Sequence, residues 1–261
     1  MKKNVFISNV FTESGIATAK AFRASGYYVY GADKKEDYEG LCDRSLRFDL
    51  NLFVTDAGYR IKFTQIFDEI MPNLNTLVFC QNPTSVAPLK EIQLEYWNAS
   101  INEEVTGLML LAKLFQMRLE KSQGSIVFIL ESQASKVKEI DIAYITSSSA
   151  LIGLMRAMSL DMAGKVKVNA ITTASEFKPE DKFKEPYMKE VAQMAVHLSD
   201  QNKVAINGTA IAMEGGLKIA WGFYEVFYFL SQKYWCVSYC IKINFKVLFS
   251  KSVILWFTGL I

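Results

Sequence analysis

The chain has 261 residues, of which 51% are hydrophobic, so it can bury one substantial core or two small ones. Its formal net charge of +2 gives no electrostatic indication of nucleic-acid binding. It has one histidine, His197, and four cysteines without a CxxC spacing, which argues against a zinc site or a Ser-His-Asp triad. We expect no bound metal, no signal peptide and a reducing, cytoplasmic compartment.

Short apolar segments alternate with helical patterns along the first 220 residues. The predicted strands cover residues 4–7, 27–32, 45–50, 75–80, 124–130, 166–172 and 209–216. The predicted helices cover residues 15–26, 55–71, 94–121, 144–164 and 185–200. The strands are apolar enough to be buried on both faces. The sequence therefore predicts an α/β fold, a doubly wound parallel sheet that is Rossmann-like, as a single domain over residues 1–220.

The C-terminal segment 221–261 differs in composition from the rest of the chain. It holds 13 aromatic residues in 41 positions, and after Glu225 its only charged residues are four lysines. Its longest uncharged segment, residues 252–261, is shorter than the 18 or more residues of a membrane-spanning helix. Three interpretations of this aromatic-rich basic tail stay open: an anchor at a membrane surface, a partner-binding extension, or a frameshifted end.

The segment SNVFTESGIA, residues 8–17, connects the first predicted strand to the first predicted helix. Ligands of doubly wound sheets bind beyond the carboxyl ends of the strands, where strand order reverses. Gly15 is the only glycine here, where a dinucleotide fingerprint has three, and we expect Asn9 to replace one because asparagine tolerates a positive φ. The helix N-terminus and the hydroxyls of Thr12 and Ser14 suit a phosphate. The alternative is an ordinary capped turn.

A carboxylate, Asp33, follows the second predicted strand, 18 residues after Gly15. A carboxylate about 20 residues beyond the glycine turn accepts hydrogen bonds from the adenosine ribose and repels a 2′-phosphate. We therefore predict NAD as the cofactor, with NADP less favoured. Lys34 and Lys35 weaken this prediction, because either can pair with a phosphate. Asp49 is expected to end the third strand, where an adenine would lie.

In this order and spacing, the segments resemble those of the short-chain dehydrogenase/reductase family from Met1 to about Leu217. The matching segments include VFISNVFTESGIATAKAF for the glycine turn, LVFCQNPTSVAPL for Asn-Asn-Ala-Gly, and AYITSSSALIG for Tyr-x-x-x-Lys. The turn is longer than the family's usual one and looks like that of enoyl-acyl-carrier-protein reductases. The resemblance and the turn together predict cofactor contacts by Asn9, Ser14, Gly15, Ile16, Asp33, Asp49, Leu50 and Asn82.

The resemblance also implies catalytic positions, and most of them are altered. Tyr144 aligns with the tyrosine that exchanges a proton with the substrate oxygen, but Ser148 stands where the family has a lysine. Without that ammonium, a tyrosine with a pKa near ~10 is a poor base at neutral pH. The active-site asparagine aligns with Glu104, and the catalytic serine aligns with Glu131 or Ser132. Activity is therefore expected to be low.

Two functions of different classes follow from these residues. The first is an NAD-dependent oxidoreductase for a small carbonyl, hydroxyl or enoyl substrate. Tyr144 would be its acid or base, Ser132 would polarise the substrate oxygen, and Glu104 or Glu131 would replace the missing base. The alternative is a catalytically inactive protein that binds a dinucleotide or a partner on the same fold. A third interpretation is a family member damaged by a frameshift after its last strand.

Family members often dimerise through the two helices predicted here at 94–121 and 144–164. On the second of these helices, Ala150, Gly153 and Ala157 form a stripe of small residues, which permits close approach of another helix. The resemblance thus implies a homodimer or tetramer. The alternative is that the stripe packs onto the sheet of its own chain.

Overall fold

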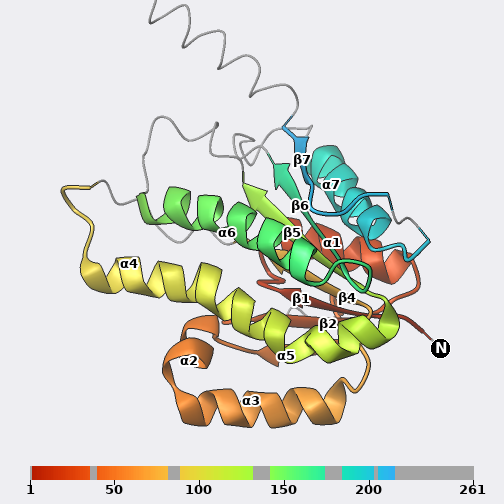
Figure 1. Ribbon diagram of the computed structural model, residues 1–261, viewed down its shortest axis with the longest axis horizontal. Helices are drawn as coiled ribbons and strands as arrows, with labels where there is room; N and C mark the ends of the chain where they lie inside the picture. The colour runs from red at the N-terminus through yellow and green to blue at the C-terminus, as the bar shows by residue number, and fades with distance from the viewer. Residues whose placement is uncertain are drawn as a thin grey trace, which may run out of the picture. The chain divides into compact units, whose positions relative to one another are not determined.

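The computed structural model describes residues 2–35, 40–81, 89–131, 142–173, 184–202 and 205–214, with only the backbone of Glu131. These residues form a seven-stranded parallel sheet in the order β3-β2-β1-β4-β5-β6-β7 (Figure 1). The strands are β1 (Asn4–Ser8), β2 (Tyr28–Asp33), β3 (Arg44–Arg47), β4 (Thr76–Cys80), β5 (Ser125–Glu131), β6 (Lys167–Thr173) and β7 (Ala210–Met213). The predicted doubly wound, Rossmann-like sheet is confirmed.

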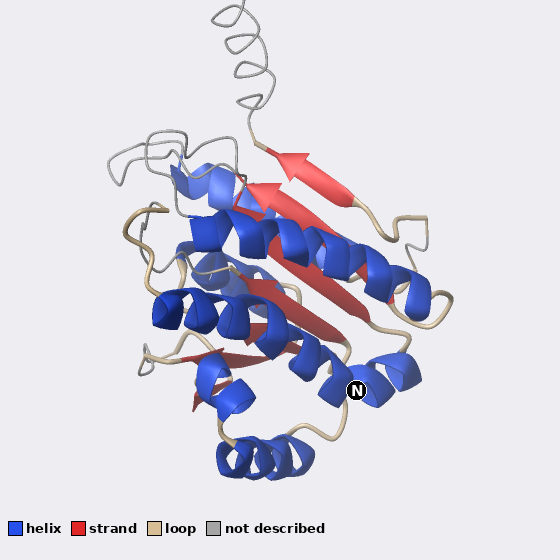
Figure 2. Cartoon of the chain, turned by 60° about the vertical axis from the view of Figure 1, so that its left-hand side comes forward, coloured by secondary structure: helices blue, strands red, loops and turns tan. Residues whose placement is uncertain are grey.

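Helices cover both faces of the sheet (Figure 2). They are α1 (Glu13–Ala24), α2 (Leu50–Thr55), α3 (Ala57–Ile70), α4 (Leu94–Ile101), the π-helical segment η1 (Asn102–Thr106), α5 (Gly107–Ser122), α6 (Ile142–Asp161) and α7 (Lys184–Leu198). Four of the five predicted helices are present as single α-helices, with ends that differ by a few residues, and the fifth is interrupted by the π-helical segment η1. In the part of the chain described here, no helix is both long and apolar enough to cross a membrane.

Alternate strand residues build two separate cores, because successive side chains of a strand point to opposite faces. Phe6 and Phe128 pack with α3, α5 and α6 on one face. Val5 and Val127 pack with α1 and α7 on the other face. Both layers bury fully apolar strand segments, which explains why the strands lack a polar alternation.

Two local predictions were wrong, and both errors fall near the candidate site. The strand predicted over 45–50 stops at Arg47, because the Asp49 side chain caps α2 by accepting the Leu52 N–H at 3.0 Å. The helix predicted over 94–121 is divided into α4, η1 and α5. Its π-helical turn carries two buried acidic residues, Glu103 and Glu104. Single-turn π segments inside helices are frequent at functional sites.

Candidate functional site

The polar residues at the carboxyl ends of β1, β2 and β4 lie at one edge of the sheet. Ser8 pairs with Ala32 of β2 and with Phe79 of β4, so the turns that follow these strands start side by side. The chain runs from β1 outward to β2 and β3 and then returns to β4 on the other side of β1. Strand order therefore reverses between β1 and β4, which is the place where ligands of such sheets bind.

Asn9 turns the chain directly after β1. Its φ is +53°, which confirms the expectation that asparagine stands in for a glycine at this position. The side chain is buried, and its Nδ2 donates to the carbonyl oxygen of Cys80 at 2.9 Å. This hydrogen bond joins the turn after β1 to the end of β4 across the point of reversal.

Gly15 is required where the turn enters α1. A Cβ at this position would lie 2.6 Å from both the Asn9 and the Val10 carbonyl oxygens, closer than real Cβ atoms come. Thr12 caps the helix by accepting the Gly15 N–H at 3.1 Å, and its hydroxyl donates to the Asn9 carbonyl oxygen at 2.9 Å. The single glycine is therefore the one that permits close approach of backbone to backbone, as at a dinucleotide turn.

Ser14 and Ile16 flank this glycine. The Ser14 hydroxyl lies 3.3 Å from that of Thr12, inside the turn. The Ile16 N–H donates to the Thr12 carbonyl oxygen at 2.8 Å within the helix, and its side chain lies in a groove on the outer surface. Of these two residues, Ser14 is the better placed to contribute a hydroxyl to a ligand at the turn.

Asp33, at the end of β2, is 7% exposed and bound to the neighbouring backbone. One carboxylate oxygen accepts the Phe11 N–H at 3.0 Å, and the other accepts the Lys35 N–H at 3.1 Å. A carboxylate oxygen has more than one lone pair, so both can still accept hydrogen bonds from ribose hydroxyls. The expected ribose carboxylate thus also holds the turn after β1.

Lys34 is held by two carboxylates of other segments. Its Nζ lies 2.5 Å from Glu103 Oε2 and 3.8 Å from Asp49 Oδ1. Burial alone would lower the pKa of Lys34, but the hydrogen bond with Glu103 and the charges of Glu103, Asp49 and Asp33 raise it above its usual value. The ammonium is therefore charged and engaged at neutral pH.

Asp49 and Leu50 lie at the start of α2. The expectation that Asp49 ends the third strand is wrong, since it caps α2, but it still lies on the Lys34 side of the site. Leu50 is buried in the core beside Gly107, so its side chain is used for packing. Asn82, also expected at the cofactor, lies outside the described residues.

Tyr144 and Ser148 lie one turn apart on α6, and both are buried. The Gln81 amide Nε2 lies 2.7 Å from Ser148 Oγ, and Gln81 Oε1 lies 3.1 Å from the same hydroxyl. Both side chains are 3% exposed, so they form a neutral, buried, hydrogen-bonded pair between β4 and α6. At the position where the resemblance implies a lysine, the structure therefore has no cationic side chain.

Of the two glutamates expected near Tyr144, the structure describes the side chain of Glu104 but only the backbone of Glu131. Glu104 is 2% exposed and lies in the π-helical turn, which contacts α6. Glu131 ends β5, so its backbone lies at the carboxyl edge, but its side chain is outside the description. Ser132 also lies outside the described residues.

Two residues of the site are missed by sequence reasoning. Gln81 follows a buried strand at a position where the family pattern has alanine, and its polar side chain is the available signal. Glu103 is one of two adjacent acids that directly precede the apolar part of a helical segment, NEEVTGLML, which indicates a buried partner. Neither signal names the partner residue, because each partner lies more than 60 positions away.

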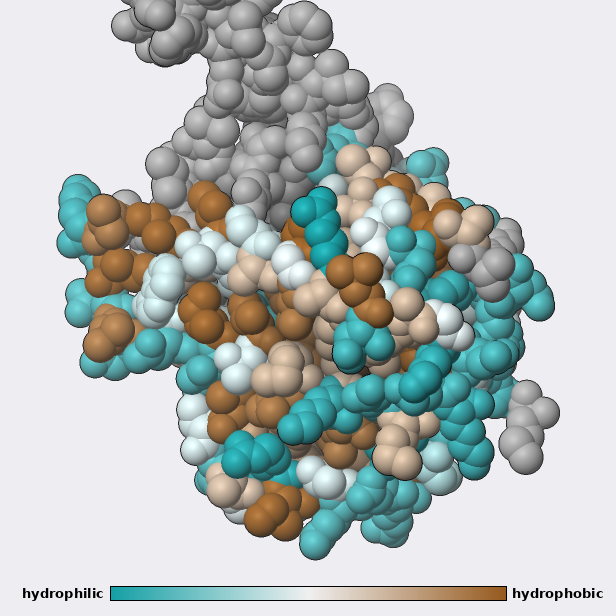
Figure 3. All heavy atoms as spheres, in the orientation of Figure 1, coloured by the Kyte–Doolittle hydropathy of each residue, from teal (hydrophilic) through white to brown (hydrophobic). Residues whose placement is uncertain are grey.

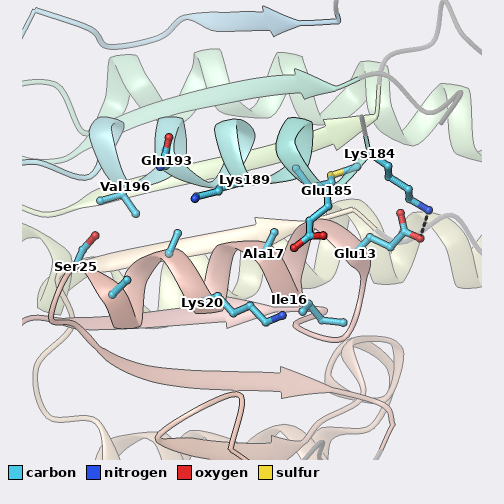
Figure 4. Close-up of a pocket in the computed structure, with 13 residues that line it drawn as sticks. Glu13, Ile16, Ala17, Lys20, Ser25, Lys184, Glu185, Lys189, Gln193 and Val196 are labelled. Carbon is cyan, nitrogen blue, oxygen red and sulfur yellow. Dashed lines mark hydrogen bonds and ion pairs between the residues drawn. The ribbon is translucent and has the colours of Figure 1, made fainter. Parts of the chain in front are cut away.

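A groove of about 970 Å³ lies between α1 and α7, on the opposite face of the sheet from α5 and α6 (Figure 4). It combines charged residues, such as Lys20 and Lys189, with apolar ones, such as Val196. An ion pair of 2.5 Å between Lys184 and Glu13 joins the two helices (Figure 4). The groove reaches the start of α1 through Glu13 and Ile16, and neither Gln81 nor Ser148 lines it.

Residues 10–175 match the protein family described as enoyl-(acyl carrier protein) reductase. The match begins in the turn after β1, extends past β6 and covers more than half of the chain. It therefore includes the glycine turn, Asp33, the π-helical turn and Tyr144.

Individual proteins are similar over most of this chain. The D-threitol dehydrogenase of Mycolicibacterium smegmatis is 22% identical over 244 residues, which cover 83% of this chain and 93% of that protein. A short-chain dehydrogenase of Leptospira borgpetersenii, solved with bound NAD+, has a TM-score of 0.70 at 12% identity, covering 84% of this chain and 93% of that one. ElxO, solved with NADP bound, has a TM-score of 0.68 at 20% identity, with coverages of 83% and 99%. The two structural likenesses show a shared fold.

Proposed function

Because the chain belongs to the short-chain dehydrogenase/reductase family of oxidoreductases, we propose that it binds NAD(H) where β1 and β4 separate. Its substrate is proposed to be a small molecule with a carbonyl, hydroxyl or enoyl group. The D-threitol dehydrogenase relative supports a hydroxyl or carbonyl substrate, and the family match supports an enoyl one. The NAD+-bound and NADP-bound structures of the same fold support a nicotinamide dinucleotide as the cofactor.

The observation that carries this proposal is the coupling of Asp33 to the turn after β1. Its carboxylate accepts the Phe11 N–H, so the expected ribose contact and the expected pyrophosphate turn form one preorganised unit. The turn also fits a dinucleotide sterically, because Gly15 keeps backbone close to backbone and Asn9 takes a positive φ. A negative charge at the ribose favours NAD(H) over NADP(H).

The reacting end of the site is less well suited to catalysis. Hydride transfer is the chemistry that a bound nicotinamide supplies, and the chain must move the accompanying proton. Tyr144 is proposed to exchange this proton with the substrate oxygen, with Ser132 as a hydrogen-bond donor and Glu104 or Glu131 as an additional base. The Gln81–Ser148 pair is neutral, so it does not lower the pKa of a nearby tyrosine as an ammonium does. We therefore propose that turnover is slow.

The neutral Gln81–Ser148 pair also favours a second candidate function. A site that binds a dinucleotide but holds a neutral buried pair beside Tyr144 also suits a catalytically inactive protein that responds to NAD(H) or binds a partner. The two functions share the binding step and differ only in the chemical step.

Direct titration tests the proposal. NADH and NADPH are added to the full chain while intrinsic fluorescence is followed, and NADH is expected to bind more tightly. NADH oxidation is then assayed with a panel of ketones and enoyl thioesters, with Tyr144→Phe as the control. Absence of NADH binding overturns the proposal. NADH binding without turnover in any assay selects the inactive binding protein.

A further inference from the structure

Lys34 occupies the position that decides how the site responds to a 2′-phosphate. It directly follows Asp33, the proposed ribose carboxylate, so an ammonium at this point of the edge is within the region where the 2′ group would lie. Its side chain is 42% exposed, which leaves room for it to reorient toward a ligand. A lysine here would ordinarily offset the repulsion between Asp33 and a phosphate.

In this structure the ammonium is already bound to Glu103. The Glu103 side chain is 7% exposed, and its Oε2 lies 2.5 Å from Lys34 Nζ. Glu103 belongs to the π-helical turn η1, which packs against α2, so the carboxylate comes from a different segment and cannot follow Lys34 into solvent. Asp49, which caps α2, lies 3.8 Å from the same ammonium.

Cations as well as carboxylates lie on this side of the site, including Arg47 of β3, which is paired with Asp33 of β2. Asp33, Asp49 and Glu103 contribute three carboxylates, against one ammonium that is shared between two of them. Lys35 adds an exposed positive charge, while its backbone N–H is bound to Asp33. A dianionic 2′-phosphate that enters here gains the Lys34 ammonium only if it displaces Glu103, and the repulsion between the phosphate and the nearby carboxylates makes this unfavourable.

We infer that Glu103 is a specificity-determining residue, which excludes the 2′-phosphate of NADP(H) by holding the Lys34 ammonium away from it. The inference rests on the proposed binding of a dinucleotide at this edge and adds the residue that sets the preference. Asp33 acts by repulsion, whereas Glu103 acts by engaging the cation that directly follows Asp33 in the chain and that could otherwise compensate for it. No contact between Glu103 and the cofactor is needed.

The test is Glu103→Gln in the full chain, with Kd values for NADH and NADPH from fluorescence titration. Glutamine keeps a hydrogen-bond acceptor for Lys34 but removes the charge, so Lys34 becomes available to the phosphate. The NADPH Kd is expected to fall about 10-fold, the gain of one charge-assisted pair, while the NADH Kd changes less than about 3-fold. Adding Lys34→Ala to Glu103→Gln is expected to abolish the gain.

Two further variants keep the test decisive. Glu69→Gln makes the same change in net charge on the exposed end of α3, next to the amino ends of the strands, and is expected to leave both Kd values unchanged. Glu103→Asp keeps the charge but shortens the reach, and it covers the case in which glutamine disturbs folding. Its NADPH Kd is expected to fall by about 3-fold, as part of one ion pair is lost.

The outcomes separate this inference from the proposed function. If the wild type binds NADH but Glu103→Gln and Glu103→Asp leave the NADPH-to-NADH ratio unchanged, Glu103 is not a specificity determinant and dinucleotide binding stands. If the gain persists without Lys34, Glu103 does not act by holding Lys34, so the inference is overturned and dinucleotide binding stands. If the wild type binds neither dinucleotide, both the inference and the proposed function are overturned.

Discussion

The proposed cofactor side of the strand edge (Asn9, Gly15 and Asp33) and the proposed reacting side (Gln81, Tyr144 and Ser148) differ in how far their residues suit nicotinamide chemistry. Around β1 and β2, Asn9, Gly15 and Asp33 belong to a hydrogen-bonded turn that we propose as the dinucleotide-binding turn. Around β4 and α6, Gln81 and Ser148 form a neutral buried pair where the family resemblance implies a cation. Because the proposed binding residues and the proposed catalytic residues lie on different strands and helices, dinucleotide binding can in principle be kept while catalysis is lost.

The two sides also differ in how their substitutions are compensated. On the cofactor side, Asn9 takes over the backbone conformation of a glycine, so the turn keeps its shape. On the reacting side, the shorter Ser148 is matched by the longer Gln81, which hydrogen-bonds to it in a site with 3% exposure of each residue. Packing is thereby preserved while charge is lost, so a stable fold does not imply a competent tyrosine.

The largest expected effect on dinucleotide binding is that of Gly15→Ala, in the turn after β1. In Gly15→Ala the new Cβ meets two backbone oxygens at 2.6 Å, so the turn must move. We expect a loss of about 1–3 kcal/mol in the free energy of unfolding and at least ~100-fold weaker NADH binding. Denaturant unfolding and fluorescence titration measure the two effects.

The matched control is Gly153→Ala on α6, where a Cβ meets nothing within 4 Å. This variant should bind NADH like the wild type, because the position lies on the outer surface of the helix. A Gly15→Ala protein with wild-type NADH affinity would show that the turn after β1 is an ordinary capped turn.

The second effect concerns the reacting side. Ser148→Lys places an ammonium in a buried site against the Gln81 amide, and we expect it to lower the free energy of unfolding by about 3 kcal/mol. Adding Gln81→Ala removes the obstructing side chain and should recover part of that loss. Only the double variant is expected to gain NADH-oxidising activity, by about 10²-fold, since it combines an ammonium with space for it.

Ser149→Lys is the matched control for this pair, since Ser149 is the next residue of α6 and is exposed. It should change the free energy of unfolding by no more than about 0.5 kcal/mol. If Ser148→Lys alone is as stable as the wild type and gains activity, the Gln81–Ser148 pair does not obstruct the lysine. In that case the longer Gln81 side chain does not fill the space that a lysine at position 148 needs.

Asp33→Ala is expected to weaken NADH binding less than Gly15→Ala does. It tests whether the carboxylate discriminates between NADH and NADPH or only holds the turn after β1. Asp33→Ala removes the proposed ribose acceptor and the acceptor of the Phe11 N–H. We expect NADH to bind about 30-fold more weakly and the preference over NADPH to disappear, as for loss of hydrogen bonds to a charged group. Asp161→Ala, an exposed carboxylate at the far end of α6, should leave both Kd values unchanged.

Equal loss of NADH and NADPH affinity in Asp33→Ala would contradict this expectation. The carboxylate would then act only through the turn, by holding the Phe11 N–H, and not by discriminating between the two ribose groups. Glu103 would remain the sole source of any preference on this side.

The sequence predicts most of the fold because apolar periodicity and glycine positions act locally. The order of strands and helices, the positive φ of Asn9 and the position of Asp33 at the end of β2 all follow from patterns within about 20 residues. The errors occur where a side chain redirects the backbone. Asp49 starts a helix by capping it, and the buried acids of NEEVT lie in a π-helical turn.

The candidate site is less predictable, because its decisive contacts join distant segments. Lys34 and Glu103 are 69 positions apart, and Gln81 and Ser148 are 67 apart. From the sequence alone, Lys34 is expected to be available to a phosphate, whereas the structure pairs it with Glu103. Such pairs cannot be assigned from composition or spacing, since many lysines and glutamates are equally compatible with them.

The smallest expected effect concerns the outer surface of the helices that carry the reacting side. Ala150, Gly153 and Ala157 are exposed on α6, so they do not pack onto the sheet. The neighbouring helix α5, on the same face of the sheet, also has exposed apolar residues, Met109 and Met117. Figure 3 shows brown, hydrophobic patches on the surface that it views. We propose that this face mediates self-association, which an inactive binding protein could retain after its catalytic residues are altered.

Ala157→Arg tests this surface with little risk to the fold, because the side chain is already exposed. Two arginines brought together at a symmetric contact repel each other, and self-association of the full chain is expected to weaken about 10-fold in sedimentation experiments. Ala24→Arg on α1, in the opposite helical layer, makes the same change and should have no effect. A wild type that sediments as a monomer at all concentrations would rule out this role. NADH binding by the dissociated Ala157→Arg variant would in addition show that the cofactor side works without a second copy, because all of its proposed contacts come from one chain.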